Sequence, residues 1–96
     1  MREGRRTTRE RMTDRLRKQS MTAAALAREF EVTASDAIDH VRHIARSLEH
    51  TDEQLLVAPP ACSDCGFADF DDLLNRPSRC PECKSEDVTE PAFRVE

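Results

Sequence analysis

The sequence predicts an α+β protein in which a three-helix domain precedes a small β-rich module held together by four cysteines. Three observations support this prediction. Threonines stand as N-caps before three helical stretches, the longest stretch has a clear amphipathic pattern, and the cysteines form two Cys-x-x-Cys pairs in the last third of the chain. A chain of 96 residues buries a limited core, so we expect the second module to need a metal or cross-links.

The first two helices are predicted from their caps. Thr7 and Glu10 have the spacing of a capping box, and the helix that follows is expected to extend to Lys18. Thr22 caps a second helix that ends near Phe30 and is rich in alanine, the best helix former. Residues 19–22 are expected to end the first helix and separate it from the second.

The third helix has the strongest pattern. Thr33 is its N-cap, and its apolar side chains lie within about 60° of Val41 on a helical wheel. These side chains are Ala34, Ala37, Ile38, Val41, Ile44, Ala45 and Leu48. A helix, a three-residue turn and a longer amphipathic helix are the layout of a DNA-binding helix-turn-helix. Glu31 stands in the turn where glycine is common, so either its backbone is strained or the turn differs.

The polar face of the third helix is a candidate DNA-binding surface. Arg42, His43 and Arg46 can donate hydrogen bonds to bases or phosphates, although Asp39 would face the same polyphosphate. Residues 1–18 carry eight basic and three acidic side chains, which suggests an anionic partner for that end. The candidate DNA-binding residues are Arg5, Arg6, Arg9, Ser35, Asp39, Arg42, His43 and Arg46. The alternative is an ordinary solvated face with salt bridges between side chains one turn apart.

The cysteines predict one structural zinc ion. Cys62 and Cys65 form the first pair, and Cys80 and Cys83 form the second after fourteen residues. Zinc prefers four such ligands at tetrahedral corners, and four thiolates leave no open position for a catalytic water. A rubredoxin-type iron site is the chief alternative, followed by two disulfides. Residues 67–70 and 76–79 are expected to lead out of and back into this site as strands.

Charge and composition exclude several classes of function. The first fifty residues have a net charge of +3 and the remainder has −7, so the second half is acidic. No segment approaches the roughly 18 apolar residues of a membrane span, and no signal peptide is evident, which predicts a cytoplasmic protein. There is no glycine-rich phosphate loop, and the cysteines are committed to metal. We therefore expect a binding protein and not an enzyme.

Several segments together resemble the archaeal predicted transcriptional regulators that join a helix-turn-helix domain to a zinc ribbon. The segments are residues 21–23, 39–48, 60–67, 76–85 and 90–94. The resemblance implies a winged helix-turn-helix, an archaeal cytoplasm and a regulatory role. The wing would contain the short apolar run at residues 54–58, paired with residues 93–95 or with the first strand of the ribbon.

These observations predict three segments: a basic flexible arm at residues 1–6, a winged helix-turn-helix domain at 7–58 and a zinc ribbon at 59–96. The first functional hypothesis is a transcriptional regulator that binds double-stranded DNA. The second is an adaptor that contacts proteins of the transcription apparatus without reading DNA. The third is an RNA-binding or translation-linked adaptor. Many such regulators are dimers, so a homodimer is one expected form.

Overall fold

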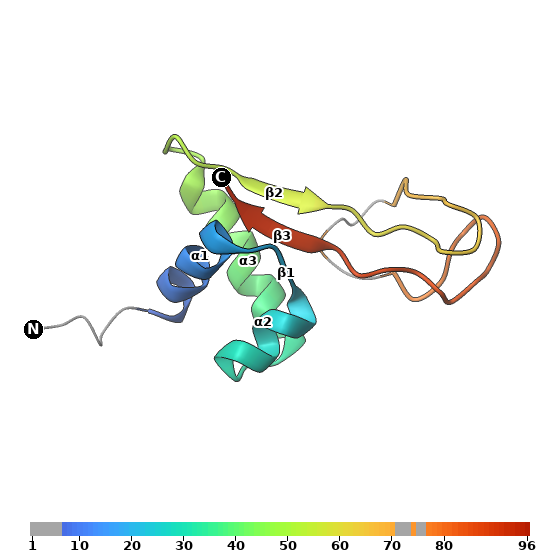
Figure 1. The fold of residues 1–96 in the computed structure, drawn as a ribbon, viewed down its shortest axis with the longest axis horizontal. Coiled ribbons are helices and arrows are strands. Elements are labelled where there is room, and N and C mark those ends of the chain that lie inside the picture. The colour runs from blue at the N-terminus through green and yellow to red at the C-terminus, as the bar shows by residue number, and fades with distance from the viewer. Residues whose placement is uncertain (1–6, 71–73, 75–76) are drawn as a thin grey trace, which may run out of the picture.

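The computed structural model describes residues 7–70, 74 and 77–96. Three helices and a small sheet lie at one end of the molecule, and the cysteine-containing segment extends from the sheet at the other end (Figure 1). None of the helices in the described ranges has the length and apolar content that a bilayer crossing needs. In chain order the elements are α1 (Thr8–Lys18), β1 (Met21–Thr22), α2 (Ala23–Phe30), α3 (Ala34–Leu48), β2 (Leu55–Ala58) and β3 (Ala92–Val95).

All three helices begin at the threonine that the sequence predicts. Each threonine hydroxyl accepts a hydrogen bond from the backbone N–H three residues later, which satisfies one of the unpaired donors of a helix start. The distances are 3.0 Å for Thr7 and Glu10, 3.1 Å for Thr22 and Ala25, and 3.0 Å for Thr33 and Asp36. The Glu10 carboxylate also accepts from the Thr7 N–H at 2.9 Å, so the predicted capping box is confirmed.

The turn between α2 and α3 has a left-handed residue at the position where the sequence lacks glycine. Glu31 has φ 58° and ψ 45°, and its N–H donates to the carbonyl of Ala27. The N–H of Val32 donates to the same carbonyl at 3.1 Å, and the Val32 side chain packs against the core. The turn therefore keeps the hydrogen bonds of a glycine-ended helix, at the cost of a backbone conformation that L-residues disfavour.

One hydrophobic core joins the three helices to the sheet. Its fully buried members include Met12 and Leu16 of α1, Leu26 of α2, and Val41 and Ile44 of α3. The amphipathic pattern of α3 is confirmed, because Ala37, Ile38, Val41, Ile44 and Leu48 are all buried. From the far end of the chain, Phe93 and Val95 of β3 enter the same core with exposed fractions of 0% and 2%.

The last strand of the chain is the centre of the sheet. The strand order is β1-β3-β2, and both pairings of β3 are antiparallel. Val95 lies opposite Leu55 and Phe93 opposite Val57, so the first of the two expected partners of residues 54–58 is confirmed. The predicted interruption between the first two helices at residues 19–22 is confirmed, and within it Met21 and Thr22 form β1, where Met21 lies opposite Phe93 and is buried. A two-residue strand is too short to show any alternation in the sequence.

The cysteine segment continues the β2–β3 hairpin in the same register. Gln54 and Glu96 exchange backbone hydrogen bonds of 2.8 and 3.0 Å at one end of the hairpin. Beyond Ala58 and Ala92 the same residue offset holds for three further pairs, Ala61 with Thr89, Cys62 with Val88, and Ser63 with Asp87, although the bonded pairs shift from even-numbered to odd-numbered residues of the first leg. The prolines at 59, 60 and 91 occupy the pair positions between these two ladders, and proline has no N–H to donate. The ribbon is therefore the outer end of one long hairpin, and the end of segment 59–96 completes the helical core.

The two return strands predicted between the cysteine pairs are absent from the described residues. Residues 67–70 and 77–79 have no strand structure, and Arg76 lies outside the described residues. Instead, the rings of Phe67 and Phe70 meet edge to face with centroids 5.0 Å apart and pack against the buried cysteines. Leu74 packs against the helical core. The described apolar side chains Phe67, Phe70 and Leu74 thus pack on two different clusters and not on one face of a strand.

Candidate metal centre and the exposed face of α3

The two Cys-x-x-Cys turns are built from the same backbone hydrogen bonds. In each turn the N–H after the second cysteine donates to the carbonyl of the first, and the first cysteine N–H donates to a carbonyl beyond the turn. The bonds are Gly66 to Cys62 at 2.9 Å, Lys84 to Cys80 at 2.9 Å, Cys62 to Phe67 at 2.8 Å and Cys80 to Ser85 at 2.8 Å. Gly66 has φ 81°, as its place after Cys65 suggests, and Lys84 has φ 67° at the equivalent place. The repetition of the two motifs was the signal that could have identified Lys84.

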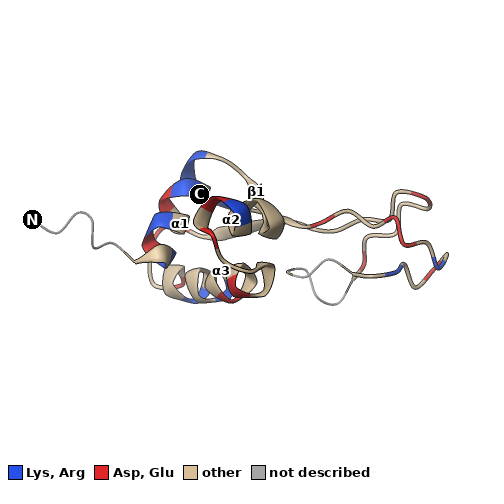
Figure 2. Cartoon of the chain, turned by 90° about the horizontal axis from the view of Figure 1, so that it is seen from below, with Lys and Arg blue, Asp and Glu red and all other residues tan. Residues whose placement is uncertain are grey.

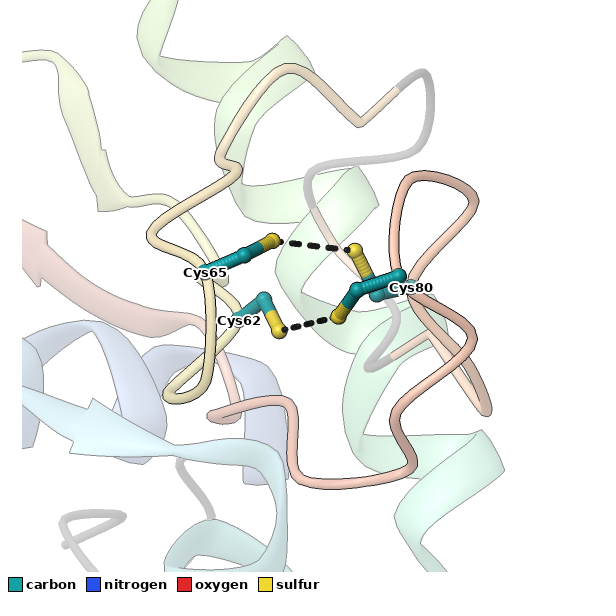
Figure 3. Close-up of side chains that lie close together, drawn as sticks. Cys62, Cys65 and Cys80 are labelled. Carbon is teal, nitrogen blue, oxygen red and sulfur yellow. Dashed lines mark hydrogen bonds between the residues drawn. The ribbon is translucent and has the colours of Figure 1, made fainter.

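The four sulfur atoms converge on one point. Each Sγ lies within 4.8 Å of the other three. Cys62 and Cys83 are 3.5 Å apart, and Cys65 and Cys80 are 3.6 Å apart (Figure 3). Sulfur atoms about 2.3 Å from a zinc ion at tetrahedral corners are separated by about 3.8 Å, so the cluster has the size of a zinc site. All four cysteines are free, and the two sulfur–sulfur distances of 3.5 and 3.6 Å are well beyond the roughly 2.05 Å of a disulfide bond.

Hydrogen bonds of the turns act on the thiols. Desolvation raises the pKa of Cys62, but the backbone N–H groups of Cys65 and Asp64 and the neighbouring thiols outweigh it and lower the pKa to about 7. For Cys65, the backbone N–H of Phe67 lowers the pKa, while desolvation and the other thiols raise it to about 12. Four thiolates this close repel one another, so only a bound cation allows all four to ionise.

A side-chain hydrogen bond links the two turns outside the sulfur cluster. The hydroxyl of Ser85 donates to the Asp64 carboxylate, and it accepts from the Asp87 N–H at 3.0 Å. Asp64 lies between Cys62 and Cys65, and Ser85 lies two residues after Cys83, so this contact ties together the two turns that carry the cysteines. The sequence analysis did not identify this contact, because it joins residues on opposite legs of the hairpin.

The exposed face of α3 carries most of the predicted DNA-binding residues. Ser35, Asp39, Arg42, His43 and Arg46 are all exposed. The Arg42 guanidinium lies 3.9 Å from the Asp39 carboxylate, and the two side chains are 46% and 64% exposed. Figure 2 shows basic and acidic segments interspersed on the helices. The face is therefore polar and mixed in charge, and its i,i+3 ion pair is weak because it is solvated.

The remaining predicted residues do not lie on this face. Arg9 is on α1 and half-buried, where it lines a hollow of about 370 Å³ together with Ile44, Ser47 and Leu48 of α3. It is thus beside the C-terminal half of α3, whereas Ser35 lies at the start of that helix. Arg5 and Arg6, with the rest of the predicted arm at residues 1–6, lie outside the described residues.

Fold and site together define a class of protein: a three-helix domain with a small antiparallel sheet, carrying a zinc ribbon with four cysteine ligands. Family models agree with both parts. Residues 7–56 match the model "PF0610-like, N-terminal", and residues 59–96 match "PF0610 rubredoxin-like zinc beta-ribbon domain". The chain belongs to this PF0610-like family, and its cofactor is one structural zinc ion.

A solved relative has the same arrangement over nearly the whole chain. The solution NMR structure of protein PF0610 from Pyrococcus furiosus is 31% identical, with 93% of this chain and 88% of that chain covered and a TM-score of 0.77. No curated protein matches the chain. The comparisons confirm the part of the predicted resemblance that joins an N-terminal domain to a zinc ribbon.

Proposed function

We propose that this chain is a non-enzymatic transcriptional regulator of the cytoplasm that binds double-stranded DNA. In this proposal α2, the turn and α3 act as a helix-turn-helix, and β2 and β3 form the base of a wing that the zinc ribbon extends. The observation that carries the proposal is the two-sided character of α3. One side is buried in the core, and the opposite side presents Arg42, His43 and Arg46 to solvent along one helix. A helix held in this way fits the major groove, where arginine reads guanine.

The acidic second half of the chain determines which side of the protein is expected to face DNA. The second half of the chain has a net charge of −7, and the four thiolates around a divalent ion add two negative charges. Polyphosphate repels that half, so DNA is expected on the helical side. The ribbon then acts as a structural cap on the hairpin and stays away from the duplex.

The proposal is tested by a salt series on a mixed-sequence 30-base-pair duplex. A protein that neutralises four phosphates gives a slope of log K against log salt of about −3.6, at roughly −0.9 per contact. Replacing Arg42 by alanine should weaken binding at least about 5-fold without moving the thermal midpoint, since a base contact contributes roughly 1–3 kcal/mol. Arg79→Ala removes the same charge from an exposed position on the ribbon and should have little effect. Equal affinity of the Arg42 variant and the wild type argues against groove insertion.

A second candidate function is an adaptor that contacts proteins of the transcription apparatus. The specific observation in its favour is that Asp36 and Asp39 are exposed on the same helix as the three basic side chains. Carboxylates facing phosphate weaken DNA binding, whereas they suit a basic protein surface. Absence of duplex binding at low salt supports this second function over the first.

A further inference from the structure

The sheet has two edge strands, and the longer of them is β2, because β1 has only two residues. The strand order β1-β3-β2 gives β2 a neighbour on one side only. Gln54 and Glu96 exchange both of their backbone hydrogen bonds, at 2.8 and 3.0 Å. Because such pairs alternate along an antiparallel ladder, the N–H and C=O groups of Leu55 and Val57 point away from β3. Among the described residues, no strand takes up these four groups.

A hollow of about 500 Å³ lies beside the start of this edge. Ala45 and Leu48 of α3 and Leu55 of β2 give it an apolar lining. Glu49 and Asp52, both exposed, stand at its rim. The site therefore combines main-chain hydrogen-bonding groups, an apolar depression and negative charge within one short stretch of surface.

The outer face of β2 is also unusual for an edge strand. Leu56 is 38% exposed, which makes it the most exposed large hydrophobic side chain among the described residues. Edge strands are usually protected by lysine, by proline within the strand or by a bulge. The four residues of β2 are Leu, Leu, Val and Ala, with the first proline directly after them. An apolar edge without such protection is a template for pairing with another strand.

We propose that the open edge of β2 and its hollow bind an extended segment of a partner protein in which apolar and basic residues alternate. The segment adds a fourth strand to the sheet and bonds the outward groups of Leu55 and Val57. Its apolar side chain enters the hollow against Ala45 and Leu48, while basic side chains reach Glu49 and Asp52. This binding mode does not depend on DNA binding by α3.

Charge favours a basic partner over a second copy of this chain. If β2 paired with β2 of another copy in the antiparallel sense, each ribbon would extend past the acidic rim of the other copy. The ribbon legs carry acidic side chains at Asp64, Glu86 and Asp87, so the two copies would repel each other there. A basic segment has the opposite interaction with the same rim.

The test uses the zinc-loaded full chain labelled with ¹⁵N and an acetylated nine-residue peptide of alternating valine and arginine. We expect the amide signals of Leu55 and Val57 to shift and their hydrogen exchange to slow on titration. A peptide of alternating valine and glutamate is the matched control and should bind more weakly. Asp52→Lys should lower affinity for the arginine peptide about 5-fold, as expected for reversal of a rim charge. Asp69→Lys makes the same charge change at an exposed position on the ribbon and should leave affinity unchanged.

Three kinds of outcome overturn the proposal. The first is that millimolar arginine peptide leaves the Leu55 and Val57 amides unperturbed. The second is that both peptides bind equally, or that a folded Asp52→Lys protein binds as tightly as wild type. The third is that these two amides are already protected in peptide-free protein of dimeric mass, which identifies the occupant as a second copy.

Discussion

Replacing Glu31 by glycine should stabilise the protein. The residue ends α2 at φ 58°, and its exposed side chain makes no contribution to the core. A left-handed conformation costs an L-residue roughly 1–2 kcal/mol, which glycine avoids. Glycine is also more flexible in the unfolded chain, and this offsets about 0.5–1 kcal/mol of the stabilisation. Removing a negative charge near a helix C-terminus adds about 0.3 kcal/mol. We expect a net gain of about 1 kcal/mol, or a midpoint about 4–8 °C higher for a chain of this size.

The chain contains a matched control for this substitution. Glu49 ends α3 and is also exposed, but its φ of −59° and ψ of −23° are right-handed. Glu49→Gly removes the same charge and should be neutral or destabilising by up to about 0.7 kcal/mol. Glu31→Ala separates the charge from the backbone, because it keeps the left-handed strain. Thermal and urea unfolding of the zinc-loaded proteins, followed by helical circular dichroism, measures all three variants. Equal stability of Glu31→Gly and Glu31→Ala would refute the backbone argument.

Three further predictions concern the core, the metal and an ion pair. Phe93→Ala should cost about 3–5 kcal/mol and abolish much of the helical signal, although the residue lies in the ribbon segment; Phe67→Ala should keep that signal. Cys80→Ser should lose zinc by metal analysis and unfold the ribbon, and a variant that retains one zinc with full stability contradicts the assignment. The hydrogen bonds from Arg17, at 2.7 Å each, hold the pKa of Glu53 below its usual range. That contribution to stability is present above the ordinary carboxyl pKa and is lost as pH falls through the lowered one. Unfolding measured between pH 5.5 and pH 3 should therefore depend less on pH in Arg17→Gln than in wild type, and parallel curves would remove the pair from the explanation.

Zinc is expected to stabilise more of this protein than the ribbon. Strand β3 supplies the buried Phe93 to the helical core, yet the chain reaches it only after residues 59–91. Bringing the ends of such a loop together costs entropy that grows with its length. A metal ion that ties Cys62 to Cys83 shortens the part of the loop that stays free, and the paired legs of the hairpin connect the metal site to the sheet. The metal is therefore expected to stabilise both parts of the chain together.

Local features of the sequence were sufficient for much of this architecture. Thr7, Thr22 and Thr33 predicted the helix starts, because a cap needs only residues three apart in sequence. The apolar spacing of α3 predicted its buried face, because one helix carries the whole pattern. The two Cys-x-x-Cys motifs predicted the metal site. Each short turn places two thiolates side by side, and two such turns supply the four ligands of a structural zinc ion.

Other features were decided only when distant segments met. The two residues of β1 become a strand because Phe93 lies opposite Met21. The sheet and the ribbon share one residue offset, and Leu74 packs on the helical core. Both features join segments that are distant in sequence, and neither segment alone identifies its partner. The edge position of β2 follows from the strand order, because a short apolar sequence does not distinguish a central strand from an edge strand. Helix caps and metal turns are satisfied within a few residues, whereas strand pairing is chosen by the core that the whole chain builds.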